Sequence, residues 1–198
     1  MKKVFLAIAL FSCVFGSMAV ASAQTTKADA GKRADEILAK VHELDLLNQL
    51  LPVLMTKEQM RKILPSVEKA REMVKATEKG EAEQLEKLAA KIDPVLKEAY
   101  EKNKVPSQEV LLEYAKTFVK LRVVRRSVIE SNTTAVLEVV QKTLDKGQLA
   151  AARNALDPKL IDPSLDKEKM SDEEKMRFWV KVILLDPQTY TILLKLSK

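Results

Sequence analysis

Residues 85–121 run LEKLAAKIDPVLKEAYEKNKVPSQEVLLEYAKTFVKL. At the centre of this stretch, residues 103–106 interrupt two long segments in which apolar residues recur every three or four positions, the spacing of a helix that packs along one face. Ser107 is a good N-cap for the second segment. A connection this short joins helices that lie side by side and antiparallel. The sequence therefore predicts a long antiparallel helical hairpin.

Both arms of this hairpin extend far beyond the quoted stretch. Residues 65–102 and 107–142 are nearly equal in length, and each spans roughly 55 Å at ~1.5 Å per residue. The stripe predicted on the first helix, which begins at Thr56, is Ile63, Val67, Ala70, Val74, Leu85, Leu88, Ile92, Val95 and Ala99. The stripe predicted on the second helix is Leu111, Tyr114, Phe118, Leu121, Arg125, Val128, Asn132, Ala135 and Val139.

Polar residues interrupt both stripes at matching heights. Thr77 and Glu81 flank Gly80 on the first helix, and Arg125 interrupts the second. Folding about the turn places Arg125 near Gln84 and Glu81, so we expect a polar layer or a kink there. A full break of the helix at Gly80 is the alternative.

The flanking segments also have helical patterns. Only four of the 198 residues are glycine, and strong helix formers dominate. A first helix is expected over residues 32–51, ended or bent by Pro52, with one apolar stripe: Ile37, Val41, Leu44, Leu47 and Leu51. Ser171 and Glu174 form a capping box for a later helix, and Asp186-Pro187 precedes the last one. The expected fold class is all-α, a long antiparallel helical hairpin with shorter flanking helices.

The chain begins with an export signal. Lys2 and Lys3 precede the apolar run 4–15, and Ala21-Ser22-Ala23 supplies the small residues that a signal peptidase recognises. We expect cleavage after Ala23 and localisation in the periplasm. A transmembrane anchor and a lipoprotein modified at Cys13 are the alternatives. Cleavage would remove Cys13, the only cysteine, and leave a mature chain without thiol chemistry.

The expected domains follow from these signals. Residues 1–23 are the signal peptide, residues 24–156 form a helical domain, and residues 157–198 form a C-terminal helical extension packed on that domain. The extension is strongly apolar, so a dimer contact or a client-binding surface is an alternative role, and a membrane-surface role is a third.

One helix-start motif occurs twice, on either side of the hairpin. In the first copy Thr56 is the N-cap, Gln59 can bond back to the Thr56 amide, and Met55 can pack on Met60. The second copy has Leu144, Asp145, Gln148 and Leu149 in the same places. Asp caps a helix as well as Thr does, so the physical role survives the substitution.

This pair of motifs resembles the LTXXQ signature of the Spy/CpxP-like periplasmic protein family, whose members carry two copies separated by a long helical segment. In the first copy Met55 occupies the position of the family's Leu, and in the second copy Asp145 occupies the position of its Thr. The resemblance covers residues 44–154. It implies an ATP-independent, stress-response chaperone that is a homodimer and binds unfolded or stressed envelope proteins on a basic, partly apolar face. The alternative is a helical adaptor or regulator that docks one envelope partner, such as a stress-sensor domain.

The residues themselves offer a candidate client-binding segment. Five cations within eleven residues, with no acid among them, raise the local affinity for anions: Lys116, Lys120, Arg122, Arg125 and Arg126. The alternative is a solvated surface neutralised by acids of the neighbouring helix. Five methionines are expected to form either an adaptable binding surface or part of the core: Met55, Met60, Met73, Met170 and Met176.

Other functional classes find little support in the sequence. His42, the single histidine, has no candidate triad partners, and zinc would require several His or Cys ligands. No glycine-rich phosphate loop is present in the sequence. The expectation is a protein that is not an enzyme, has no cofactor or metal, binds no nucleic acid and is not stably inserted in a membrane.

Overall fold

The computed structural model describes residues 24–198, with side chains from residue 31 onward. The predicted signal peptide, residues 1–23, lies outside the described residues. The chain divides into two compact units, Met1–Lys40 and Val41–Lys198. Helix α1 (Gln24–Leu50) belongs to both, and every other described helix belongs to the second unit.

The described residues are helical and include no strand, which confirms the predicted all-α class. The elements after α1 are η1 (Leu51–Val53), α2 (Lys57–Lys102), α3 (Gln108–Thr143), α4 (Lys146–Ala155), η2 (Pro158–Leu160), η3 (Lys167–Lys169), α5 (Asp172–Trp179), the π-helix η4 (Val180–Leu184) and α6 (Thr189–Leu196). None of these helices is long and apolar enough to cross a bilayer.

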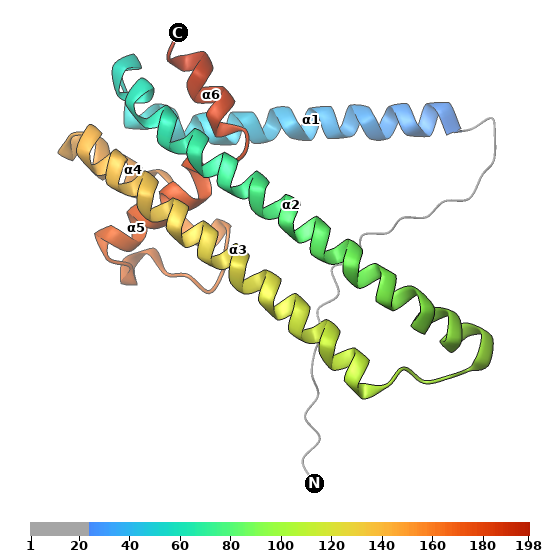
Figure 1. The fold of residues 1–198 in the computed structure, drawn as a ribbon. Coiled ribbons are helices and arrows are strands. Elements are labelled where there is room, and N and C mark those ends of the chain that lie inside the picture. The colour runs from blue at the N-terminus through green and yellow to red at the C-terminus, as the bar shows by residue number, and fades with distance from the viewer. Residues whose placement is uncertain (1–23) are drawn as a thin grey trace. The chain divides into compact units, whose positions relative to one another are not determined.

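Helices α2 and α3 run antiparallel and side by side as the predicted hairpin (Figure 1). Asn103 ends α2 with a left-handed backbone (φ 50°), and the Ser107 hydroxyl accepts from the Val110 amide to start α3. The helix continues through Gly80, so the alternative of a full break there is wrong.

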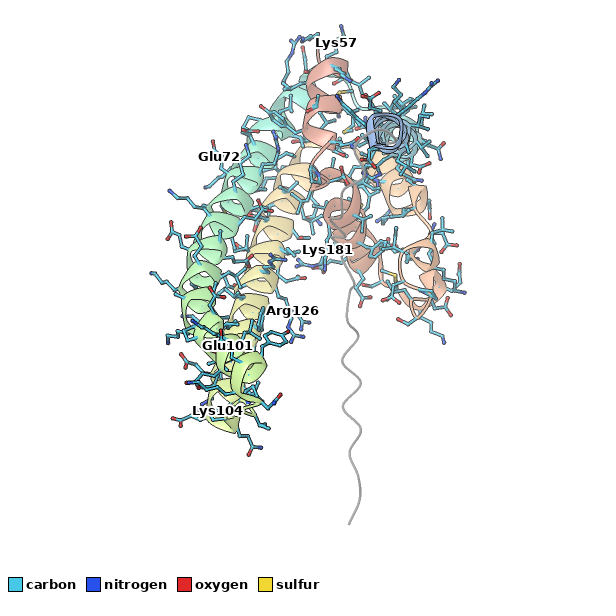
Figure 2. All side chains as sticks on the ribbon, turned by 90° about the vertical axis from the view of Figure 1, so that its right-hand side faces the viewer. Lys57, Glu72, Glu101, Lys104, Arg126 and Lys181 are labelled. Atoms are coloured by element: carbon cyan, nitrogen blue, oxygen red, sulfur yellow. The ribbon has the colours of Figure 1, made fainter. Side chains whose placement is uncertain are left out.

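The hydrophobic core lies at one end of the hairpin, where α2 begins and α3 ends. The short helices gather there (Figure 1), and Figure 2 shows Lys57 at this end and Lys104 at the other. Completely buried apolar side chains come from α1, η1, α2, α3, α5, η4 and α6: Leu50, Val53, Ile63, Val67, Val136, Val140, Trp179, Val180, Leu184 and Leu193. The segment after Asp157 thus supplies part of the same core as the hairpin.

The face of α1 that packs in the second unit differs from the predicted one. Leu46 and Leu50 are buried, whereas Val41, Leu44 and Leu51 are exposed, so the predicted stripe is wrong. Neighbouring leucines offer two faces rotated by about 100°, and the contacts with the core select one of them.

Methionines take both predicted roles. Met55, Met60 and Met176 are buried in the core, whereas Met73 is exposed on the hairpin. An adaptable surface made of all five methionines is therefore wrong.

Polar side-chain contacts tie the C-terminal helices to the rest of the second unit. His42 Nε2 lies 2.9 Å from Asp186 Oδ2, and Lys195 donates to Glu43 at 2.7 Å. Glu130 on α3 accepts from Arg177 at 2.9 Å, and this bond holds the pKa of the Glu130 carboxyl below its ordinary value.

Candidate functional site

Both sequence motifs form capping boxes. The Thr56 hydroxyl accepts from the Gln59 amide, and the Gln59 side chain accepts from the Thr56 amide at 2.9 Å. Asp145 and Gln148 repeat this geometry at the start of α4. In both copies the apolar residue before the cap, Met55 or Leu144, is buried in the core.

The two boxes also bind each other, which the sequence did not suggest. Gln59 Nε2 donates to Gln148 Oε1 at 2.8 Å, and Gln148 Nε2 donates back to Gln59 Oε1 at 2.9 Å. Each amide nitrogen also donates to the carbonyl two residues before the other cap, from Gln59 to Thr143 and from Gln148 to Leu54. The two helix starts are thereby joined by a nearly symmetric set of four hydrogen bonds.

This pairing gives a physical reason for glutamine at both positions. Glutamate would serve a capping box equally well, and the third box in the chain, at Ser171, uses Glu174. At neutral pH a carboxylate can only accept, whereas an amide can accept from its own cap and also donate to the opposite motif. The residues of these two capping boxes therefore hold the base of the hairpin together.

The predicted polar layer is present in the middle of the hairpin. Arg125 Nε donates to both carboxylate oxygens of Glu81 at 2.7 Å, which confirms the predicted register. The Glu81 side chain is 5% exposed and that of Arg125 is 63% exposed. Hydrogen bonding to Glu81 raises the pKa of Arg125, so its guanidinium stays charged. The guanidinium covers the Glu81 carboxylate, which is buried between the two helices.

We expect Arg125→Ala to destabilise the protein by about 2 kcal/mol, because it leaves the buried Glu81 carboxylate without a partner. Glu81→Ala should cost less than about 1 kcal/mol, since Arg125 remains in water. Urea unfolding followed by circular dichroism measures both changes. Arg122→Ala is the control, since the exposed Arg122 forms no ion pair with the described residues. Equal losses for Arg125→Ala and Arg122→Ala would contradict this account of the pair.

Beyond the core, the hairpin projects as a pair of helices that we call the arm, residues 72–131. Within the arm only Glu81, Leu88 and Leu121 are buried. Two helices can cover at most one face of each other, and thirteen large apolar side chains of the arm are exposed. They are Met73, Val74, Leu85, Leu96, Tyr100, Val105, Leu111, Leu112, Phe118, Val119, Val123, Val124 and Ile129.

Four of these residues were expected inside the hairpin. Leu111 and Phe118 belong to the stripe predicted for α3, but they are 52% and 48% exposed. Val74 and Leu85 belong to the stripe predicted for α2 and are exposed as well. Other members of the predicted α3 stripe do lie in the seam, namely the buried Leu121 and the half-buried Tyr114, whose hydroxyl donates to the Lys91 carbonyl. The arm therefore exposes more apolar surface than its sequence pattern suggested.

The predicted cations all lie on the arm and are all exposed. Arg125 is bound to Glu81, whereas no acid of the described residues pairs with the other four: Lys116, Lys120, Arg122 and Arg126. No acidic residue occurs between Glu113 and Glu130, so this part of α3 is positive along its length. Figure 2 shows Arg126 on the side of α3 on which Lys181 also lies.

The described part of the chain contains no group of three His, Cys, Asp or Glu side chains that could hold a metal ion. His42 is bound to Asp186 beside the core. The candidate binding site is therefore the arm, which combines exposed apolar side chains with cations that form no ion pair with the described residues.

In comparisons with known proteins, no family model, no curated protein and no solved structure matches this chain.

Proposed function

We propose that the protein is an exported, ATP-independent chaperone-like protein that holds unfolded or stressed envelope proteins on the arm, residues 72–131. The observation that carries the proposal is the burial of only three side chains in the arm while thirteen large apolar ones are exposed. Soluble proteins rarely leave such a surface in water unless it makes contacts.

The composition of this surface suits weak binding of many sequences. Aliphatic side chains and Phe118 can hold apolar segments of an unfolded chain without directional bonds. The four unpaired cations attract acidic segments and raise the rate of encounter. The resemblance to the periplasmic chaperone family supports the same proposal.

An aggregation assay tests the proposal. Two unrelated chemically denatured enzymes are diluted into buffer with an equimolar amount of the protein and no nucleotide. We expect light scattering from both to be suppressed. Suppression of neither contradicts the proposal, and stable binding of one envelope protein without suppression would favour the adaptor alternative.

The arm's apolar side chains provide a sharper test. We expect the double substitution Phe118→Ser and Val123→Ser to raise the amount of protein needed for half-suppression about fivefold or more, because it removes contact area from the client-binding surface. The matched control is Leu160→Ser with Ile161→Ser, which changes two exposed apolar residues outside the arm. Equal effects of the two double substitutions would contradict client binding on the arm.

A further inference from the structure

A cavity of about 390 Å³ lies between the hairpin and the C-terminal helices, at the root of the arm. Its walls come from α2, α3, η4 and the turn before α6. The apolar lining residues are Ala70, Val74, Ile129, Leu185 and Pro187. A second cavity of about 210 Å³ shares Val74, Glu78 and Ile129 with the first, so it lies next to it, and its lining includes Glu81 and Arg125.

The cavity has the size and the character of a small-molecule site. Such sites span roughly 300–1,000 Å³ and are mostly apolar with a few polar groups. The π-helix η4 contributes Lys181 to the lining, and π-helical turns occur often at functional sites. In Figure 2 Lys181 lies between the C-terminal helices and the hairpin.

The charged lining residues favour an anion. Arg71, Lys75 and Lys181 border the cavity together with one acid, Glu78. Arg71 is bound to Glu68 and stacks on the Tyr190 ring, and Lys181 lies 3.6 Å from Glu130. Lys75 forms no ion pair with the described residues, so it is the cation available to a ligand.

The wall has little capacity to bind a peptide backbone. Asn132 is 3% exposed, and its Nδ2 donates to the Ala70 carbonyl at 3.1 Å. Its Oδ1 accepts no hydrogen bond from the described residues and is the one free acceptor of a buried side chain in the lining. A peptide would bury several amide groups without partners, whereas an alkyl chain brings none.

From these observations we infer that the cavity binds a free fatty acid, with the alkyl chain along Val74, Ile129 and Leu185 and the carboxylate at Lys75. At ~30 Å³ for a group the size of a water molecule, the main cavity holds about a dozen such groups, which corresponds to a medium-length chain. The cavity shares Val74, Lys75 and Ile129 with the root of the arm. The binding of a fatty acid there does not depend on chaperone activity.

Isothermal titration of the purified protein with dodecanoate, below the concentration at which micelles form, tests the inference. We expect one dodecanoate per chain. Decanoate should bind more than tenfold more weakly, at about fourfold for each methylene removed. Dodecanol, which lacks the charge, should also bind at least tenfold more weakly.

Matched variants locate the site. Ile129→Trp fills the cavity and should reduce the affinity for dodecanoate at least tenfold, whereas Val123→Trp, on an exposed part of α3, should not. Lys75→Glu should reduce the affinity at least tenfold, whereas Lys69→Glu, outside the lining, should not. Thermal unfolding by circular dichroism checks that each variant is folded.

Three results would overturn the inference. The first is no saturable binding of dodecanoate. The second is binding that Ile129→Trp and Val123→Trp weaken equally, which would indicate adsorption to exposed apolar surface. The third is flotation with phosphatidylglycerol vesicles in the absence of any binding of monomeric dodecanoate, which would indicate a membrane surface as the ligand.

Discussion

Trp179→Ala should destabilise the protein by about 4 kcal/mol, a large part of the ~5–15 kcal/mol that holds a typical domain together. Trp179 is the last residue of α5 and is 1% exposed among core residues of the hairpin and the C-terminal helices. Truncation loses the apolar burial of the indole and leaves a cavity that the surrounding helices can fill only in part. Urea unfolding followed at 222 nm measures the loss without needing the tryptophan signal.

Trp179→Phe is the informative control. The indole Nε1 is buried and donates to no acceptor among the described residues, so this substitution removes an unsatisfied donor as well as some volume. The two effects oppose each other, and we expect a net change within about 1 kcal/mol. If Trp179→Ala also cost less than 1 kcal/mol, the C-terminal helices would not be packed on the hairpin in solution.

Gln59→Glu should destabilise the protein by about 3 kcal/mol, although it preserves the capping box. The introduced carboxylate can still accept from the Thr56 amide, but it cannot donate to Gln148 or to the Thr143 carbonyl. The Thr143 carbonyl and Gln148 Oε1 lose the donor from residue 59 and face a negative charge instead, and Gln148 Oε1 keeps the Asp145 amide. Because the negative charge is unfavourable at this site, the folded protein binds a proton on the introduced carboxyl more readily than the unfolded chain does. The loss should therefore shrink as the pH falls towards about 4, where the protonated carboxyl can donate again.

The control is Glu174→Gln, the reverse exchange, in the capping box at Ser171, which is not paired with another box. It keeps the acceptor for the Ser171 amide and has no second motif to bind, so the expected change is about 0.5 kcal/mol or less. A double-mutant cycle with Gln59→Ala and Gln148→Ala should give a coupling energy of about 1–2 kcal/mol. Additive effects of these two substitutions would show that the boxes act only as separate helix caps.

Local signals predicted the boundaries of the hairpin helices well. The N-caps Thr56, Ser107 and Asp145 mark the starts of α2, α3 and α4, and the turn after Lys102 marks the end of α2, to within a residue or two. The predicted start of the first helix at residue 32 is wrong, because α1 begins at Gln24. Capping and turn chemistry depends on neighbours in sequence, so it can be recognised without knowledge of the fold. The pairing of Glu81 with Arg125 could also be predicted, because a short turn fixes the register of two straight helices.

Tertiary contacts determine which apolar side chains are buried where the sequence offers more than one face. Leu44, Leu46, Leu47 and Leu50 offer two apolar faces on α1, and only the packed core distinguishes Leu46 and Leu50 as the buried ones. Phe118 follows the helical stripe but remains exposed because the arm has one partner helix and no third layer. No sequence signal marked the π-helix after Trp179.

The candidate site was predicted in part. The cations of residues 116–126 were recognised from composition. Whether acids of α2 form ion pairs with them depends on how the two helices are rotated about their axes, which the sequence does not determine. The exposed apolar side chains around them appeared only with the structure. The choice of glutamine over glutamate at residues 59 and 148 was the one available signal for the paired motifs, and its meaning depends on their distance in space.

Site-specific photocrosslinking tests the central proposal, client holding on the arm, most directly. A photoreactive phenylalanine analogue replaces Phe118 in one sample and Leu160, an exposed residue outside the arm, in another. Each sample is illuminated with either of two unrelated denatured enzymes. The account predicts crosslinks to both enzymes from residue 118 and few from residue 160. Crosslinks of equal yield from the two positions, or none from residue 118 while aggregation is still suppressed, would contradict it.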